Sequence, residues 1–294
     1  MKQKKNKKMT SELTIKNELK NKIILITGGA GSIGSALTAE LLNYPVRSIR
    51  VFDNDEHSLF QLKQSLNNSK IDLLLGDILD KDRVDYAMKD VDIVIHTAAL
   101  KNIEITEYNP LQTIDTNVNG TVNLLKMAIK HNPKKFINIS TDKVVESSTL
   151  YATTKQIGER LTSWAGKHMK NTKFATIRFG NVIETRGNVF EVWKKQSENN
   201  QPLSITDPKM KRYFFHMDEA TNFIIQCIVQ MKSGEIMIPK MKLYKIKDLA
   251  TKISKKQKII GFRQGEKLQE VLITDEEKKN AQNRGNMWVI KQYL

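Results

Sequence analysis

The sequence predicts an α/β fold: a doubly wound, mainly parallel sheet with a smaller C-terminal lobe that binds the substrate. Three observations lead to this prediction. Short apolar runs alternate with helical patterns over residues 21–180, as in parallel sheets whose strands are joined by crossover helices. A glycine-rich turn separates the first strand from the first helix, and the second strand ends in an acidic residue. Together these features are typical of a domain that binds a dinucleotide.

The composition is that of a globular protein. Of 294 residues, 39% are hydrophobic, and no apolar run approaches the roughly 18 to 20 residues of a membrane-spanning helix. No apolar signal segment follows the lysine-rich N-terminus, so we expect a cytoplasmic protein without a membrane span. The single cysteine, Cys227, excludes an internal disulfide and a cysteine-rich metal site, and its apolar neighbours favour a core position. We predict no metal.

The formal net charge of +16 raises the possibility of a nucleic-acid partner. Much of the charge is local, however: five lysines lie within residues 1–8, and eight lie in residues 240–258, where they alternate with apolar residues. Such alternation is typical of a solvated helix face. Without an aromatic stacking platform or zinc-ligand spacing, we expect no nucleic-acid partner, and the basic patches suit a substrate that carries a pyrophosphate.

The first strand, Lys22–Thr27, leads into a turn in which glycine recurs at three-residue intervals. Glycines at this spacing let the backbone turn tightly and approach a phosphate, which then lies at the helix N-terminus. The turn predicts a dinucleotide-binding Rossmann domain. The expected cofactor contacts here are Gly28, Gly31, Ser32, Ile33 and Gly34.

The second strand, Ser48–Phe52, ends in Asp53, about 20 residues after the glycine turn. A carboxylate at this position accepts hydrogen bonds from the adenosine ribose and repels the 2′-phosphate of NADP, so NAD is favoured over NADP. Two alternatives stay open. In the first, Asp53 only opens a turn and does not contact the cofactor. In the second, Arg50 or Lys63 provides the positive charge for binding NADP.

Further cofactor contacts are expected after the third and fourth strands, Ile71–Leu75 and Val91–Ile95. His96, at the end of the fourth strand, fits a packed core imidazole as well as a functional one. A long helix is predicted from Thr116, and Asn117 near its start is expected to bridge the active-site helix and strand. The expected contacts are Asp77 and Ile78 around the adenine, Ala98 and Ala99 at the middle of the cofactor, Lys101 and Asn117.

The fifth strand, Phe136–Ile139, precedes the segment that most strongly indicates chemistry. Tyr151 and Lys155 stand four residues apart, which places both side chains on one face of a helix. A phenol beside an ammonium ionises more readily, so this pair is predicted to take a proton from a hydroxyl while hydride leaves the same carbon. Thr141, Asp142 and Lys143 are expected on the loop that leaves the strand, and these proton-carrying groups indicate chemistry beyond oxidation.

Residues 1–20 are predicted to be a basic arm, either flexible or a loosely docked helix. Residues 21–180 are predicted to form the NAD(P)-binding domain. Residues 181–294 are predicted to form the substrate-binding lobe, and the helix Met217–Met231 and strand Glu235–Pro239 are expected to return to the main sheet.

Candidate substrate contacts lie mainly beyond the sixth strand, Phe174–Phe179. Arg212 and Arg263 are expected to clamp a diphosphate, since the guanidinium fork matches phosphate oxygens. The alternative is that both are surface arginines in salt bridges. The full set of predicted substrate contacts is Lys101, Asn181, Arg186, Arg212, Arg263 and Glu266.

From Asn21 to Thr274 the chain resembles the extended short-chain dehydrogenase/reductase family, and within it the inverting UDP-N-acetylglucosamine 4,6-dehydratases of polysaccharide biosynthesis. The most specific element is Asp142-Lys143 after a threonine, because ordinary sugar-nucleotide 4,6-dehydratases carry Asp-Glu there and 4-epimerases lack such a pair. Other shared motifs are Thr116-Asn117-Val118-Asn119-Gly120, Arg178-Phe179-Gly180-Asn181-Val182 and Arg263-Gln264-Gly265-Glu266-Lys267-Leu268. The chain departs from the family around the sugar pocket, at residues 102–104, 146–148, 152–155 and 184–187.

The resemblance implies a UDP-sugar substrate, a tightly bound and recycled NAD or NADP, and a homo-oligomer. It implies that Tyr151, its pKa lowered by Lys155, takes the proton of the 4-hydroxyl. Lys143, its pKa lowered by nearby cations, removes the C5 proton, and a protonated Asp142 donates to the leaving 6-hydroxyl. Reprotonation of C5 on the other face inverts it. Alternatives are a UDP-hexose 4-epimerase that uses the same tyrosine, a non-catalytic dinucleotide-binding protein and a nucleic-acid-binding protein.

Overall fold

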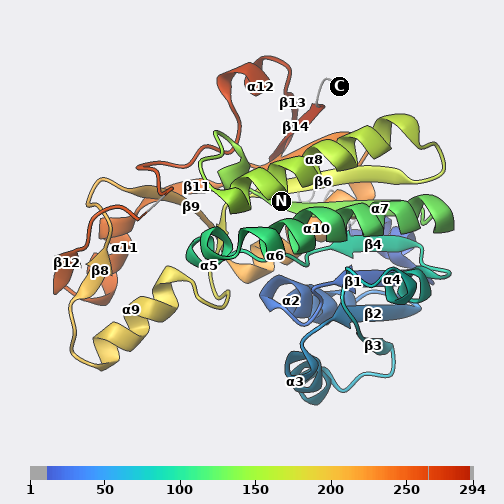
Figure 1. The fold of residues 1–294 in the computed structure, drawn as a ribbon, viewed down its shortest axis with the longest axis horizontal. Coiled ribbons are helices and arrows are strands. Elements are labelled where there is room, and N and C mark those ends of the chain that lie inside the picture. The colour runs from blue at the N-terminus through green and yellow to red at the C-terminus, as the bar shows by residue number, and fades with distance from the viewer. Residues whose placement is uncertain (1–11, 264, 292–294) are drawn as a thin grey trace, which may run out of the picture.

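The computed structural model describes residues 12–263 and 265–291, and these residues form a nine-stranded central sheet with the order β13-β14-β10-β6-β5-β4-β1-β2-β3 (Figure 1). The pairs β10-β14 and β13-β14 are antiparallel, and the remaining neighbours in this sheet are parallel. The predicted fold class is confirmed. The strands are β1 (Ile23–Thr27), β2 (Ser48–Asp53), β3 (Ile71–Leu75), β4 (Ile93–His96), β5 (Lys135–Thr141), β6 (Lys173–Phe179), β10 (Glu235–Pro239), β13 (Gln282–Arg284) and β14 (Met287–Lys291).

Helices cover both faces of the sheet because its central strands are apolar on both faces. Along β1, Ile24 and Ile26 pack into one core cluster with α2, α3 and α10. Ile23 and Leu25 point the other way and pack with α4, α7 and α8. The helices are α2 (Ser32–Leu41), α3 (Glu56–Leu66), α4 (Lys81–Met88), α7 (Gly120–His131), α8 (Leu150–His168) and α10 (Met217–Gln230).

The helix predicted from Thr116 begins with a π-helical turn that contains Asn117. The Asn117 side chain accepts a hydrogen bond from the Leu100 amide (2.8 Å) and donates to the Leu100 carbonyl (2.9 Å) and to Thr154 Oγ1 (3.0 Å). The predicted bridge is confirmed, and it joins α8 to the loop after β4. The short elements before α7 are α5 (Ile103–Tyr108), α6 (Pro110–Ile114) and the π-helical turn η1 (Asp115–Asn119).

After residue 180 the chain builds a small lobe with its own core, in which Trp193 is fully buried beside Leu203 and Phe214. Figure 1 shows this lobe at one end of the main sheet. The chain then returns, because β10 pairs with β6, and β14 pairs with β10. Elements after residue 180 that lie outside the main sheet are β7 (Asn181–Val182), α9 (Val189–Glu198), β8 (Leu203–Ile205), β9 (Lys211–Phe215), β11 (Lys242–Lys245), α11 (Ile246–Ile253), β12 (Gln257–Ile259) and α12 (Asp275–Lys279).

Residues 12–19 are helical and dock on the main core. Leu19 is fully buried there, and the Glu18 carboxylate lies 2.7 Å from the Lys135 ammonium. The lysine-rich residues 1–11 of the predicted arm lie outside the described residues. Cys227 is buried, as expected. Within the described ranges, no helix is long and apolar enough to span a bilayer.

Candidate active site

The glycine turn after β1 forms a tight cradle at the N-terminus of α2. Gly28 has a φ of +65°, and a Cβ atom on it would lie 2.6 Å from the backbone of Ala98. A Cβ atom on Gly34 would lie 2.4 Å from the Gly28 carbonyl oxygen. Gly31 caps α2 without a side-chain hydrogen bond, so the amides of the first turn remain available to an anion. The cradle therefore fits the pyrophosphate of a dinucleotide.

Asp53, at the end of β2, holds this cradle in place. Its carboxylate accepts hydrogen bonds from the Ala30 amide (2.9 Å) and the Asp55 amide (3.1 Å). Each carboxylate oxygen keeps a free lone pair, so the group can also accept from a ribose hydroxyl. Asp53 therefore has a structural task in addition to its predicted contact with the cofactor.

The two residues predicted around the adenine point in different directions. The Asp77 carboxylate accepts hydrogen bonds from the Leu79 amide (2.9 Å) and from Asn54 Nδ2 (3.2 Å). Ile78 is buried and packs against Gly120, where a Cβ atom would lie 2.4 Å from Ile78 Cδ1. The side chain of Ile78 thus belongs to the core, and its predicted contact with the cofactor falls to its backbone.

His96 is a core imidazole, the first of the two interpretations left open by the sequence. It is fully buried, with Nδ1 2.8 Å from Thr27 Oγ1 and Nε2 3.0 Å from Thr121 Oγ1. Thr121 donates its own proton to the Asn117 carbonyl, so its oxygen accepts from Nε2–H and the Thr27 hydroxyl donates to Nδ1. Burial, followed by the charge of Lys155, lowers the pKa of His96 to about 3.

The predicted catalytic helix is α8, which begins directly after Thr149. The Thr149 hydroxyl oxygen accepts a hydrogen bond from the Ala152 amide (3.2 Å) and so caps the helix. Tyr151 and Lys155, one turn apart, both face one cleft of about 1120 Å³ between the main sheet and the small lobe. The structure therefore confirms that both side chains lie on one helix face.

Asp142 and Lys143 meet at the end of β5, in the short 3₁₀ turn η2 (Asp142–Val144). Asp142 is fully buried, and its Oδ1 lies 3.0 Å from Lys143 Nζ and accepts from the Thr141 hydroxyl at 3.1 Å. Lys143 Nζ also lies 3.5 Å from Asn181 Oδ1, while Asn181 Nδ2 donates to the Tyr213 carbonyl (3.1 Å). Lys143 is thereby directed into the cleft.

The pKa values of Tyr151 and Lys143 are shifted in the direction opposite to the one expected from the sequence. Burial raises the pKa of Tyr151, and the cation that opposes this shift most is Lys143. Burial also lowers the pKa of Lys143, but its acidic neighbours, chiefly Asp142, outweigh this effect, so the net pKa is raised. The expectation for Tyr151 was wrong because it ignored burial, and the expectation for Lys143 was wrong because it ignored the acidic neighbours of the ammonium, chiefly the adjacent Asp142. Burial lowers the pKa of Lys155 to about 8, although Glu159 opposes the shift.

The predicted substrate contacts converge on the same cleft. Arg212 is largely buried and donates to the carbonyl oxygens of Lys211 (2.9 Å) and Leu268 (3.4 Å). The Arg263 amide donates to Glu266 Oε2 (3.0 Å), so these two residues form one turn. The predicted site residues that line the cleft are Ile33, Ala99, Lys101, Thr141, Lys143, Tyr151, Lys155, Asn181, Arg186, Arg212, Arg263 and Glu266.

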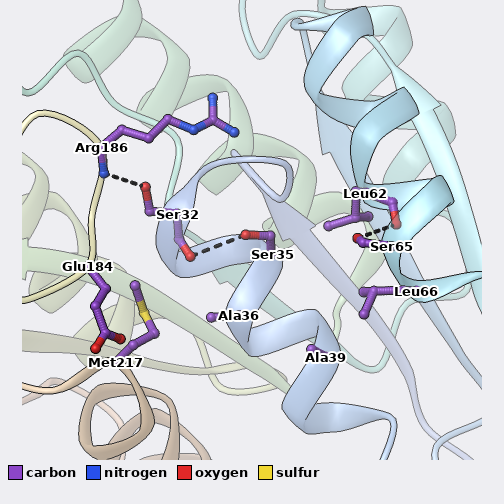
Figure 2. A pocket seen from close by; sticks show the side chains of 10 residues that line it. All are labelled: Ser32, Ser35, Ala36, Ala39, Leu62, Ser65, Leu66, Glu184, Arg186 and Met217. Carbon is purple, nitrogen blue, oxygen red and sulfur yellow. Dashed lines mark hydrogen bonds between the residues drawn. The ribbon is translucent and has the colours of Figure 1, made fainter.

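Arg186 extends from the small lobe over the glycine turn (Figure 2). Its amide donates to Ser32 Oγ (3.0 Å), and its guanidinium donates to the Ala30 carbonyl (3.1 Å) and Ser58 Oγ (3.0 Å). Lys101 Nζ donates to the Arg186 carbonyl (3.3 Å). Arg186 also borders a smaller pocket of about 440 Å³ beside α2. The guanidinium thus lies at the cofactor cradle, and Arg186 also lines the cleft in which substrate contacts are predicted.

Glu270 is a site residue that the sequence interpretation missed. It is buried, lines the cleft and interacts electrostatically with Lys143. The shared motif stopped two residues short of it, at Leu268. The available signal was an acidic residue directly before the apolar run Val271–Ile273.

Comparisons with known proteins agree with this geometry. The profile of a family described as "Polysaccharide biosynthesis protein" matches residues 24–292. An uncharacterized membrane protein of Methanocaldococcus jannaschii is 41% identical over 95% of this chain and 88% of its own length. A UDP-N-acetylglucosamine 4,6-dehydratase (inverting) of Campylobacter jejuni is 39% identical over 87% of this chain and 78% of its own. A UDP-glucose 4-epimerase of Rickettsia bellii is 34% identical over 92% of this chain and 83% of its own length.

Solved structures show the same fold. The X-ray structure of Pen from Bacillus thuringiensis superposes with a TM-score of 0.88 and 34% sequence identity, and covers 93% of this chain and 89% of its own. A dTDP-glucose 4,6-dehydratase of Streptomyces venezuelae, solved with NAD bound, superposes with a TM-score of 0.78 at 19% identity, over 87% of this chain and 90% of its own.

Proposed function

Because the chain belongs to the polysaccharide biosynthesis protein family, within the extended short-chain dehydrogenases/reductases, we propose that it is a nucleotide-sugar 4,6-dehydratase that acts on UDP-N-acetylglucosamine. The observation that carries the proposal is the Asp142–Lys143 pair, in which the buried Asp142 carboxylate holds the ammonium of Lys143, a residue that lines the same cleft as Tyr151 and Lys155. The enzyme is a hydro-lyase that converts its substrate into a UDP-4-keto-6-deoxy sugar with inversion at C5.

In the first step, Tyr151 accepts the proton of the sugar 4-hydroxyl. The cation of Lys143 and the Thr141 hydroxyl favour the phenolate that this step needs, against the effect of burial. When bound, a nicotinamide would supply the redox chemistry, as hydride acceptor for oxidation at the sugar C4 and as hydride donor for C6. Lys155, which is buried one turn along α8 from Tyr151 and lines the same cleft, would hold the cofactor there.

In the second step, Asp142 and Lys143 remove water across C5 and C6. The two groups form an ion pair in the structure, and transfer of one proton along the 3.0 Å hydrogen bond converts it into a neutral amine and a protonated carboxyl. The amine then takes the C5 proton, which the 4-ketone acidifies, and the carboxyl protonates the leaving 6-hydroxyl. These transfers restore the ion pair, so the pair needs no external proton.

The cofactor is NAD, tightly bound and recycled within each turnover. The Asp53 carboxylate at the end of β2 supports this choice, because a 2′-phosphate would meet a negative charge there. Arg186 supports tight binding, because its guanidinium straps the small lobe to the glycine cradle. Release and assay of the nucleotide carried by the purified protein identifies it as NAD or NADP.

The protein acts as a homo-oligomer. Large apolar side chains that face solvent on α5, α6 and α8 support this part of the proposal, since Tyr108 is 87%, Leu111 77% and Trp164 43% exposed. Light scattering of the purified protein measures the mass of the assembly. A monomeric mass at micromolar concentration rejects the assembly and leaves the proposed reaction untouched.

A UDP-hexose 4-epimerase is the second candidate, favoured by the 34% identical epimerase relative. The two candidates differ in the product. With UDP-N-acetylglucosamine in deuterated water, the dehydratase gives a 4-keto-6-deoxy sugar with deuterium at C5 and substrate-derived hydrogen at C6, which NMR resolves. A product that differs only at C4 identifies the epimerase, and tight cofactor binding without turnover on any nucleotide sugar identifies a non-catalytic protein.

A further inference from the structure

We propose that Glu270 is a further acid of the active site, beside Tyr151 and Asp142, and that it acts as a positioning residue. Its carboxyl stays protonated, and this allows Asp142 and Lys143 to exchange the single proton that they share. This inference rests on the proposed dehydratase reaction. Glu270 lies outside the motif from which the reaction was inferred.

The fold brings Glu270 to the pair from a distant part of the sequence. The segment before it runs beside β9, where Gln269 bridges to Lys211 and the Lys211 amide donates to the Leu268 carbonyl (2.9 Å). This pairing turns Glu270 inward while Leu268 and Gln269 stay exposed. Glu270 is only 3% exposed, although it lines the cleft.

The carboxyl groups of Asp142 and Glu270 share an unusual feature. Asp142 Oδ2 and Glu270 Oε2 are both buried, and within the described residues neither oxygen has a hydrogen-bond partner. A buried carboxylate oxygen without a donor is costly, whereas a protonated carboxyl carries no charge and has its own proton to donate. Two acids that face the same ammonium cannot both ionise without mutual repulsion. Asp142 already pairs with Lys143, so Glu270 is the acid that keeps its proton.

The charges around Glu270 agree with this assignment. Burial and the nearby Asp142 charge raise the pKa of Glu270, while the cations of Lys143, Arg212 and Lys267 oppose the shift without cancelling it. Two of these cations donate hydrogen bonds to backbone carbonyls, and they act on Glu270 through their charge alone. Arg212 donates to backbone carbonyls, and Lys267 donates to the carbonyl oxygens of Val145 and Glu146.

The protonation state of Glu270 matters because Lys143 must lose its proton before it can act as a base. An ionised Glu270 would add a second negative charge beside the ammonium and hold the proton on Lys143. A protonated Glu270 leaves Lys143 balanced by Asp142 alone, so the proton can move to Asp142. Glu270 thus acts through Lys143 and does not itself exchange protons with the sugar.

The test compares Glu270→Gln, which mimics the protonated acid, with Glu270→Ala. We expect Glu270→Gln to keep kcat within about threefold of the unmodified protein at neutral pH. The fall in kcat caused by ionisation of Glu270 at higher pH should disappear in this variant. Glu270→Ala should lose activity more severely, because it leaves a cavity beside the pair. Glu276→Gln, at an exposed carboxylate of α12 that does not line the cleft, is the matched control and should leave the pH profile unchanged.

A second measurement does not depend on turnover. The infrared spectrum of the unmodified protein at neutral pH should contain the carbonyl stretch of a protonated carboxyl, and Glu270→Gln should lack this band. The proposal is overturned if the band persists in Glu270→Gln, if the two pH profiles superimpose, or if Glu270→Gln loses as much activity as Glu270→Ala. If no 4-keto-6-deoxy sugar forms at all, the proposed function fails, and the infrared band still tests Glu270.

Discussion

Lys143 Nζ lies 3.0 Å from Asp142 Oδ1, so the two groups that must exchange a proton during elimination are already joined by one hydrogen bond. Asp142 is fully buried, whereas the Lys143 side chain is 21% exposed toward the cleft. The carboxyl therefore stays fixed, and the amine is the group that can reach a sugar carbon.

Removing either partner should stop the reaction after the first hydride transfer. In Lys143→Ala and Asp142→Asn we expect 4-keto-6-deoxy product formation to fall by about 10²- to 10⁴-fold, the usual contribution of a general acid or base. Oxidation at C4 uses neither group as its base, so reduced nicotinamide should accumulate and raise its absorbance, most clearly in Asp142→Asn, which keeps the Lys143 cation that favours the Tyr151 phenolate. Lys247→Ala, at an exposed lysine of α11, is the control and should behave as the unmodified protein. Unchanged product formation in Lys143→Ala would favour the epimerase instead.

Replacing Arg186 should loosen the cofactor. Arg186→Ala removes one guanidinium hydrogen bond to the cradle, at the Ala30 carbonyl, and one to Ser58 of α3, each with a net contribution of about 1 kcal/mol, so we expect release of the bound nucleotide to become about 10- to 30-fold faster. The release rate is measured by diluting the purified protein into an excess of a cofactor-free reporter dehydrogenase, which captures the released nucleotide and becomes active. Arg263→Ala, at an exposed arginine of the substrate side, should leave this rate unchanged. Equal rates of nucleotide release from the two variants would contradict the proposal that Arg186 retains the cofactor.

Two glycines of α8 should respond oppositely to the same substitution. A Cβ atom on Gly166 would lie 2.3 Å from the Gly234 amide nitrogen, in rigid backbone, whereas one on Gly158 would lie 3.3 Å from the side chain of Asn138. In a helix, alanine is favoured over glycine by about 1 kcal/mol. Gly166→Ala should therefore lower the thermal midpoint by several degrees, and Gly158→Ala should leave it near or above that of the unmodified protein. Equal midpoints would mean that α8 can shift away from β10.

His96 should make the fold sensitive to acid. Its pKa is about 3 in the folded protein and about 6.5 when unfolded, so below pH 6.5 the unfolded chain binds a proton that the folded protein does not. Stability therefore falls as the pH drops toward 3, by about 2 kcal/mol between pH 6.5 and 5. Urea titrations of His96→Gln should lack this part of the decline. His57→Gln, at an exposed histidine, should retain it in full.

The sequence predicted those features that contiguous residues determine. The glycine cradle, the Tyr151–Lys155 face and the Thr141–Lys143 turn each depend on a few neighbouring positions, whose backbone preferences and helical spacing are local properties. The alternation of strands and helices was sufficient to predict the parallel sheet.

Features that depend on long-range packing were missed or assigned to the wrong neighbour. Glu270 reaches Lys143 only because its segment runs beside β9, and no local pattern contains that pairing. Arg186 reaches Ser58 across the two lobes. The pKa direction of Tyr151 was wrong because burial in the folded protein raises that pKa. The pKa direction of Lys143 was wrong because the adjacent Asp142, followed by the distant Glu270, raises that pKa against the effect of burial.

The small lobe is built from two separate segments of the chain, one between β6 and α10 and one between β10 and β13, because α10 packs on the main core and β10 lies directly beside β6. It therefore has four covalent connections to one scaffold. The sugar preference of such a lobe can change during evolution while the redox machinery stays intact. A chain cut after residue 180 would lose the lobe together with β10, β13 and β14 of the sheet that supports that machinery.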